Sequence, residues 1–260
     1  MTFVKTALCV VAVTLLSAHV APSVDDNNRY LKVTPQADGI RLAYTVFFGE
    51  IPGASERKLL DANHDGQIDS AESKAYGDKL AAQVASAVDV ELDGQSQKLV
   101  WSIVDVGMGS PQVAAGSFSV DMIAYVCGGG STTHRVKLRD QFRVPRPGET
   151  DVKVEDSPSI TVTKARVGPA DDPTHEYRFV GPGGPLSDDG LDVEFTAGTD
   201  APRIANEQCG KGGTRSGAGA GKPSGTRYIL LGAAMLVAAG ALAAFIWRKR
   251  ASATPKSRAQ

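Results

Sequence analysis

Hydrophobic and polar residues alternate along most of the chain between residues 30 and 196. Residues 135–139, Arg-Val-Lys-Leu-Arg, show the alternation clearly, and this period of two is typical of β-strands with one buried face. Clusters rich in Gly, Pro, Asp and Asn separate the alternating segments. The pattern predicts ten strands, at residues 30–34, 40–48, 88–92, 99–106, 117–126, 133–142, 152–154, 159–167, 177–180 and 191–196.

One stretch has a helical spacing instead. Residues 54–60 and 70–88 flank a polar loop, and apolar residues recur every four positions from Tyr76 to Val88, as on one face of a helix. We therefore expect a mainly β (α+β) protein. Its predicted fold is an antiparallel β-sandwich with a helix–loop–helix, residues 54–88, inserted after the second strand.

At the amino terminus, a basic residue is followed by apolar residues and then by small ones. Lys5 is followed by a ten-residue apolar run and by small residues up to Ser23, which is the order found in secretory signal peptides. The run is too short to cross a bilayer. We predict a signal peptide at residues 1–23, with a retained anchor as the alternative.

A second uncharged segment lies near the carboxyl end. Residues 228–247 contain no charged side chain and have an aromatic residue at each edge. At about 1.5 Å per residue, this segment spans roughly 30 Å as a helix, the thickness of the hydrocarbon core. It is therefore predicted to be a transmembrane helix, and the basic residues that follow it predict a cytoplasmic tail at residues 248–260.

The segment before this span, residues 210–227, is rich in Gly and small polar residues and is predicted to be a flexible linker. A secreted start and a late span together place residues 24–209 outside the cell membrane. The chain is thus expected to be single-pass, with its main domain in the periplasm or on the cell surface. In the alternative interpretation, the carboxyl-terminal segment is a sorting signal that is later removed.

The charge of this predicted domain is strongly negative. It holds all 29 acidic residues and only 18 of the 28 lysines and arginines, a net charge of −11, although the whole chain carries only −1. A nucleic-acid-binding domain needs clustered positive charge. The excess of acidic residues argues against a nucleic-acid partner and favours a surface that attracts cations.

Residues 61–72 read Asp-Ala-Asn-His-Asp-Gly-Gln-Ile-Asp-Ser-Ala-Glu, which matches the twelve-residue loop of EF-hand calcium-binding proteins. Calcium takes six to eight oxygen ligands, and Gly66 stands at the sixth position, where the loop turns sharply. Ile68, at the eighth position, is expected to point away from the ion and to make a short strand contact. The predicted Ca²⁺ ligands are Asp61, Asn63, Asp65, the backbone carbonyl of Gln67, Asp69 and Glu72.

The sequence contains one such loop, whereas EF-hand loops usually work in pairs. The single copy argues against a calmodulin-like sensor and favours a structural role for the ion. The alternative is a turn rich in Asp and Asn that matches the pattern by chance.

Two cysteines, Cys127 and Cys209, remain once the signal peptide is removed. In an oxidising compartment they either form a disulfide or remain as one buried and one exposed thiol. The sequence leaves both alternatives open.

No set of residues with catalytic spacing is present, so the chain is not expected to be an enzyme. Three histidines follow the signal peptide, and His64 lies inside the calcium loop at a position that supplies no ligand. An unrecognised surface hydrolase is kept as an alternative.

Several segments together resemble the extracytoplasmic region of bacterial nickel/cobalt permeases and HupE/UreJ-type membrane proteins. They include Glu50-Ile51-Pro52 before the acidic loop and Leu138-Arg139-Asp140 in a later strand, and the resemblance covers about residues 28 to 198. That family continues with several membrane spans, whereas this chain has one. The resemblance implies a detached domain that binds metal or a protein partner near a metal transporter.

The prediction is a membrane-anchored, extracytoplasmic calcium-binding protein of bacterial type that acts as a binding or accessory module. Its expected partners are Ca²⁺, the membrane and a possible protein near a metal transporter. An accessory role in nickel or cobalt uptake is the alternative that the resemblance suggests.

Overall fold

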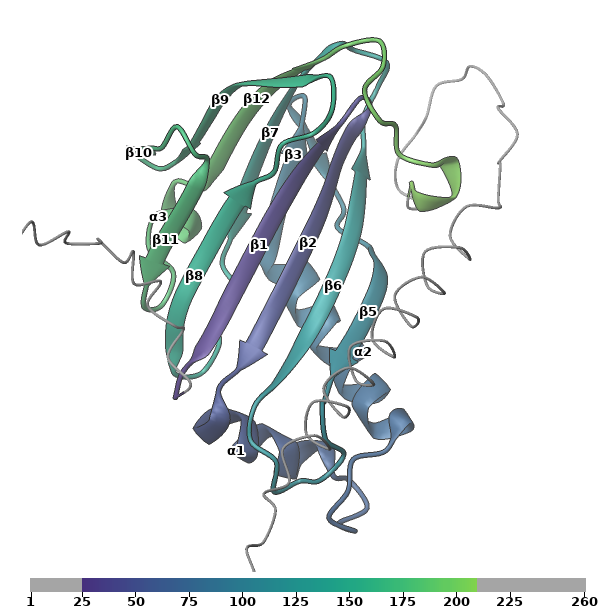
Figure 1. The fold of residues 1–260 in the computed structure, drawn as a ribbon, viewed down its shortest axis with the longest axis vertical. Helices are drawn as coiled ribbons and strands as arrows, with labels where there is room; N and C mark the ends of the chain where they lie inside the picture. The colour runs from purple at the N-terminus through teal and green to yellow at the C-terminus, as the bar shows by residue number, and fades with distance from the viewer. Residues whose placement is uncertain (1–24, 210–260) are drawn as a thin grey trace, which may run out of the picture. The chain divides into compact units, whose positions relative to one another are not determined.

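The computed structural model describes residues 25–209, which form two six-stranded sheets and a few short helices (Figure 1). The fold is mainly β and sandwich-like. The first sheet has the order β11 (Glu176–Val180), β8 (Pro147–Val154), β1 (Asn27–Gln36), β2 (Gly39–Phe48), β6 (Phe118–Cys127) and β5 (Trp101–Gly107). The second has the order β10 (Ala170–Asp171), β9 (Ile160–Val167), β12 (Leu191–Ala197), β7 (Thr133–Asp140), β3 (Val88–Leu92) and β4 (Gln95–Gln97).

All ten predicted strands are present, and the structure adds the short edge strands β4 and β10. Most strands pair antiparallel as expected, but β1 pairs with β8 in parallel. The predicted antiparallel arrangement therefore holds for most strand pairs, but not for β1 and β8. The chain leaves the second sheet after β7 and joins the first sheet beside β1, and the alternation within a strand carries no information about which strand becomes its neighbour.

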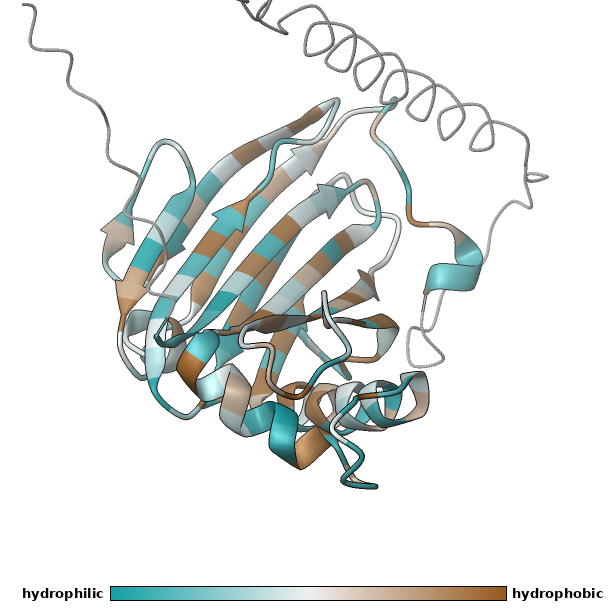
Figure 2. Ribbon diagram, turned by 60° about the horizontal axis from the view of Figure 1, so that its bottom comes forward, coloured by the Kyte–Doolittle hydropathy of each residue, from teal (hydrophilic) through white to brown (hydrophobic). Residues whose placement is uncertain are grey.

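Side chains from both sheets pack into one hydrophobic core. Apolar and polar residues alternate along the strands (Figure 2), and the apolar positions point inward. Val33, Leu42 and Val120 of the first sheet and Val136 and Val193 of the second are all fully buried in this shared cluster. The core explains why the period-of-two pattern predicts the strands so well.

A buried polar cluster also joins the two sheets. Arg29 Nη1 of β1 lies 2.8 Å from Asp140 Oδ2 of β7, and the Tyr44 hydroxyl donates to the same oxygen at 2.9 Å. Burial raises the pKa of the Asp140 carboxyl, and the Arg29 charge opposes that rise. Asp140 therefore has a structural role, because it links the two sheets.

Two helices lie between β2 and β3, as predicted. Helix α1 (Glu50–Leu60) begins four residues earlier than the expected start at residue 54, because Pro52 lies in the first turn, where its missing N–H is not needed. Helix α2 (Ser70–Ala87) packs beside β5. Two short elements follow, α3 (Pro185–Asp188) and a 3₁₀ turn (Asn206–Gln208).

Within residues 25–209, no helix combines the length and the apolar composition needed to cross a membrane. The predicted signal peptide (1–23), linker (210–227), transmembrane helix (228–247) and tail (248–260) lie outside the described residues.

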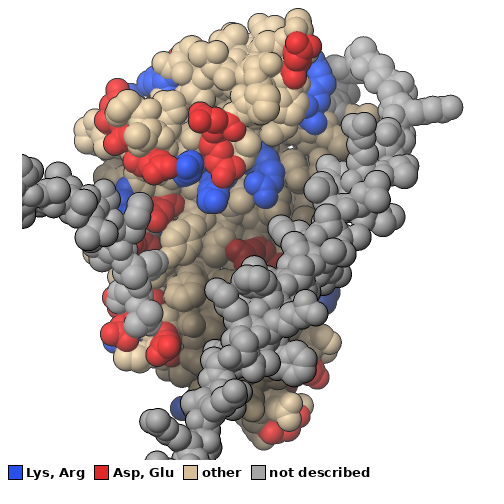
Figure 3. Space-filling view, in the orientation of Figure 1, with Lys and Arg blue, Asp and Glu red and all other residues tan. Residues whose placement is uncertain are grey.

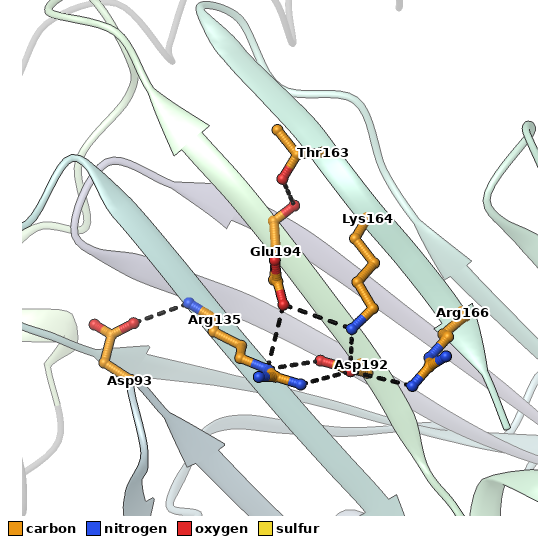
Figure 4. A network of polar contacts seen from close by, with 7 residues as sticks. All are labelled: Asp93, Arg135, Thr163, Lys164, Arg166, Asp192 and Glu194. Atoms are coloured by element: carbon orange, nitrogen blue, oxygen red, sulfur yellow. Dashed lines mark hydrogen bonds and ion pairs between the residues drawn. The ribbon is translucent and has the colours of Figure 1, made fainter.

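Acidic and basic side chains are interspersed on the outer face of the first sheet (Figure 3). On the second sheet they form a network around Asp192, which accepts hydrogen bonds from Arg135 and Lys164 (Figure 4). Burial alone would raise the pKa of Asp192, but these hydrogen bonds and charges outweigh it and lower the pKa to about 2.

A disulfide joins Cys127 at the end of β6 to Cys209, with the two Cα atoms 5.6 Å apart. The structure thus selects one of the two alternatives that the sequence left open. The bridge holds the segment after β12 beside the first sheet, where the Ala37 N–H also donates to the Pro202 carbonyl at 2.7 Å.

Replacing both cysteines by serine is expected to lower the free energy of unfolding by about 3 to 5 kcal/mol, because the bridge closes a long loop, with a sequence separation of 82. Urea denaturation with and without a reducing agent measures the effect. The reducing agent should destabilise the wild-type chain and leave the double variant unchanged. Equal stability of all samples would contradict the structural role of the bridge.

Asp192 should contribute stability that is present above pH 3.8, the ordinary pKa of the carboxyl, and is lost as the pH falls toward about 2. Over this pH range, the free energy of unfolding should therefore fall by roughly 1 to 2 kcal/mol less in Asp192→Asn than in the wild type, as acid denaturation measures. Asp156→Asn, at an exposed loop position, is the matched control and should follow the wild-type curve. An Asp192→Asn curve parallel to wild type would contradict the assignment.

Candidate calcium site

The predicted calcium loop connects α1 to α2 and is mostly exposed. Asp61 is the C-cap of α1 and is buried, while Asp69 is the N-cap of α2. Between them, residues 62–67 face solvent and Ile68 is again buried. The loop is therefore fixed at both ends by the helices and at one point in its middle.

The first three predicted ligands lie close together around the turn. Asp61 Oδ1 and Asn63 Oδ1 both accept a hydrogen bond from the Asp65 N–H, at 3.1 and 2.9 Å, and Asp61 Oδ2 accepts from the Gly66 N–H at 3.1 Å. Asp65 Oδ1 accepts from the Gln67 N–H at 2.8 Å. Backbone N–H groups thus hold these side-chain oxygens on the inner side of the loop.

The last two side-chain ligands, Asp69 and Glu72, form a capping box at the start of α2. Asp69 Oδ1 accepts from the Glu72 N–H at 2.8 Å, and Glu72 Oε2 accepts from the Asp69 N–H at 3.0 Å. Glu72 Oε1 also reaches back to the Ala62 N–H at 2.9 Å. The twelfth residue of the loop therefore contacts its beginning and closes the ring.

Gln67 lies in a short antiparallel bridge with Gln112, from the connection between β5 and β6. The Ile68 N–H donates to the Pro111 carbonyl at 2.7 Å, and the Val113 N–H donates to the Gly66 carbonyl at 3.1 Å. These bonds flank Gln67, so its own N–H and carbonyl point away from Gln112, toward the inside of the loop. The predicted strand contact of Ile68 is confirmed.

Two residues of the loop have a left-handed backbone. His64 has φ 61° and Gly66 has φ 82°, and such a conformation is strained for residues other than glycine. The space around Gly66 is open, since a Cβ built there has no neighbour within 4 Å. The backbone angle alone explains why glycine occupies this position.

Within residues 25–209, no three His, Cys, Asp or Glu side chains lie close enough together to hold a metal ion. The carboxylates of the loop point to backbone N–H groups in this structure. The chemistry of the donor set and the path of the backbone nevertheless fit a hard divalent cation, because the ligands are all oxygens and the Gln67 carbonyl faces inward.

Arg57 of α1 is a residue that sequence reasoning missed. It is fully buried, and its guanidinium donates to five backbone carbonyls between Met108 and Ser117 at 2.5 to 3.1 Å. Burial lowers its pKa. No pattern in the sequence marks it, because an arginine in an amphipathic helix normally lies on the exposed face.

A groove of about 710 Å³ lies beside the loop, between α1, α2 and residues 142–145. Its lining is largely apolar and includes Leu60, Tyr76 and Phe142. Glu72 also lines it, so the calcium loop and the groove share a side chain.

Comparison with known proteins gives no further guide to this site: no protein-family model and no curated protein matches the chain. The resemblance to nickel/cobalt permease relatives therefore stays a prediction.

Gly66→Ala is expected to cost about 1 kcal/mol of stability through backbone strain and to weaken calcium binding about fivefold, because the loop no longer turns freely. Gly94→Ala is the matched control: Gly94 has φ 77° and equally open surroundings, but lies in the β3–β4 turn. Calorimetric calcium titration should separate the two variants. Equal calcium affinities in both would contradict a role for the turn in ion binding.

Proposed function

We propose that this chain is an extracytoplasmic calcium-binding protein whose EF-hand-like loop, residues 61–72, holds one Ca²⁺. The observation that carries the proposal is the closed ring of the loop, in which Glu72 returns to the Ala62 N–H and the side chains of Asp61, Asn63 and Asp65 are held inward. These contacts bring the two ends of the loop together and support the proposal.

The ligand chemistry favours calcium over other divalent ions. Asp61, Asn63, Asp65, Gln67, Asp69 and Glu72 offer oxygen atoms only, which suits a hard cation that accepts six to eight ligands. Nickel favours imidazole ligands, and none of the six predicted ligands is a histidine. An accessory role in nickel or cobalt uptake therefore rests on the sequence resemblance alone.

The ion would have a structural role. Outside the cell, calcium is near millimolar, and a site with a tenfold smaller dissociation constant gains about 1.4 kcal/mol of stability from it. This is a structural contribution, too small to drive a large change of fold. The groove beside Glu72 supports a role as a binding or accessory module.

The predicted signal peptide and transmembrane helix complete the proposal. They would anchor the acidic domain to the outer side of the cell membrane by a single span, where calcium is abundant. Protease protection of the domain in intact cells tests this placement.

Isothermal titration of the purified full chain with Ca²⁺ is the direct experiment. Glu72→Gln should weaken calcium binding at least tenfold, because the ligand that closes the ring loses its charge. Asp78→Asn is the matched control, since Asp78 lies exposed on the same helix in an ion pair with Lys74. It should bind as the wild type does.

Absence of binding heat in the wild-type chain would overturn the calcium proposal. Equal affinities of wild type and Glu72→Gln would place the ion elsewhere.

A further inference from the structure

The calcium loop pairs with a segment that is not a calcium loop. Residues 111–113, in the connection between β5 and β6, exchange two backbone hydrogen bonds with the loop on either side of Gln67. In this segment, Pro111 offers a carbonyl and Val113 offers an N–H. The connection thus supplies the backbone partner that the single loop of the sequence lacks.

The same connection is held in place by α1. The Arg57 guanidinium binds the carbonyls of Met108, Ser110, Gln112, Gly116 and Ser117. Arg57 lies one turn before Asp61, the first residue of the calcium loop. One side chain therefore ties the helix that leads into the loop to the segment that pairs with the middle of the loop.

We propose that residues 108–117 act as a surrogate second loop, and that Arg57 and Val113 are positioning residues for calcium ligation by residues 61–72. The inference rests on the proposed calcium function and goes beyond it, because it assigns a role to residues that supply no ligand.

The physical reason lies at Gln67. Its carbonyl is the backbone ligand of the loop, and it faces inward because the bridge to Gln112 fixes the direction of the peptide groups on both sides. Without the bridge, this carbonyl must be ordered when the ion binds, and the ordering costs conformational entropy. Loss of the bridge should therefore weaken calcium binding while every ligand remains.

Val113 offers a clean test of the bridge. It is the second residue of a turn closed by the Ala115 N–H and the Gln112 carbonyl at 3.0 Å, a position at which proline is favoured. Val113→Pro removes the N–H that donates to Gly66. Val113→Ala is the matched control, because it shortens the side chain and keeps the N–H.

Calcium titration of the full-length chain should show binding about three- to tenfold weaker in Val113→Pro, the effect of one net hydrogen bond, and wild-type affinity in Val113→Ala. The rise in the midpoint temperature of unfolding between EDTA and saturating calcium should also shrink in Val113→Pro. If the bond between the Val113 N–H and the Gly66 carbonyl only stabilises the fold, its loss should lower the unfolding midpoints in EDTA and in calcium by the same amount.

Arg57→Lys provides a second variant, since one ammonium replaces a guanidinium that serves five carbonyls. It should lower calcium affinity in the same direction as Val113→Pro. If Arg57→Lys does not fold, the comparison of Val113→Pro with Val113→Ala alone tests the proposed positioning role.

The results distinguish the two proposals. Calcium binding by the wild type with equal affinity in Val113→Pro would overturn the surrogate loop and leave the calcium site standing. A wild-type chain that binds no calcium would overturn both.

Discussion

The contact between Arg57 and the β5–β6 connection is the interaction on which the helical unit depends. A buried guanidinium is costly unless each donor finds an acceptor, and here five backbone carbonyls provide them. The side chain also lies over the Phe118 ring, 5.5 Å from its centroid, and Phe118 stacks on Phe48 at 4.6 Å. Helix α1 is thereby attached to the first sheet through both polar and aromatic contacts.

This attachment explains how a single helix–loop–helix unit can be stable without a second such unit beside it. Paired calcium loops support each other through a short strand contact between them, and here the sandwich provides that contact through Gln112. Helix α2 adds a second attachment, since Gly77 lies so close to β5 that a Cβ at this position would come within 2.7 Å of the Val106 side chain. The sandwich thus provides the packing partner of the α1–α2 unit.

The predicted calcium loop concentrates negative charge at the end of this unit. Its carboxylates are held by backbone N–H groups, and Glu72 lies in both the loop and the wall of the apolar groove. Ala62 and Ala71 of the same loop also line the groove, so the loop forms part of its wall.

The sequence by itself determined the strands, the two helices and their insertion after the second strand, because local periodicity and spacing specify all of these. The calcium-ligand pattern from Asp61 to Glu72 is likewise a prediction from local spacing. Only the tertiary structure decided the parallel pairing of β1 with β8, the choice of a disulfide for Cys127 and Cys209, and the burial of Arg57. Each of these features joins residues that are far apart along the chain. The periodicity of one segment does not specify which other segment packs against it.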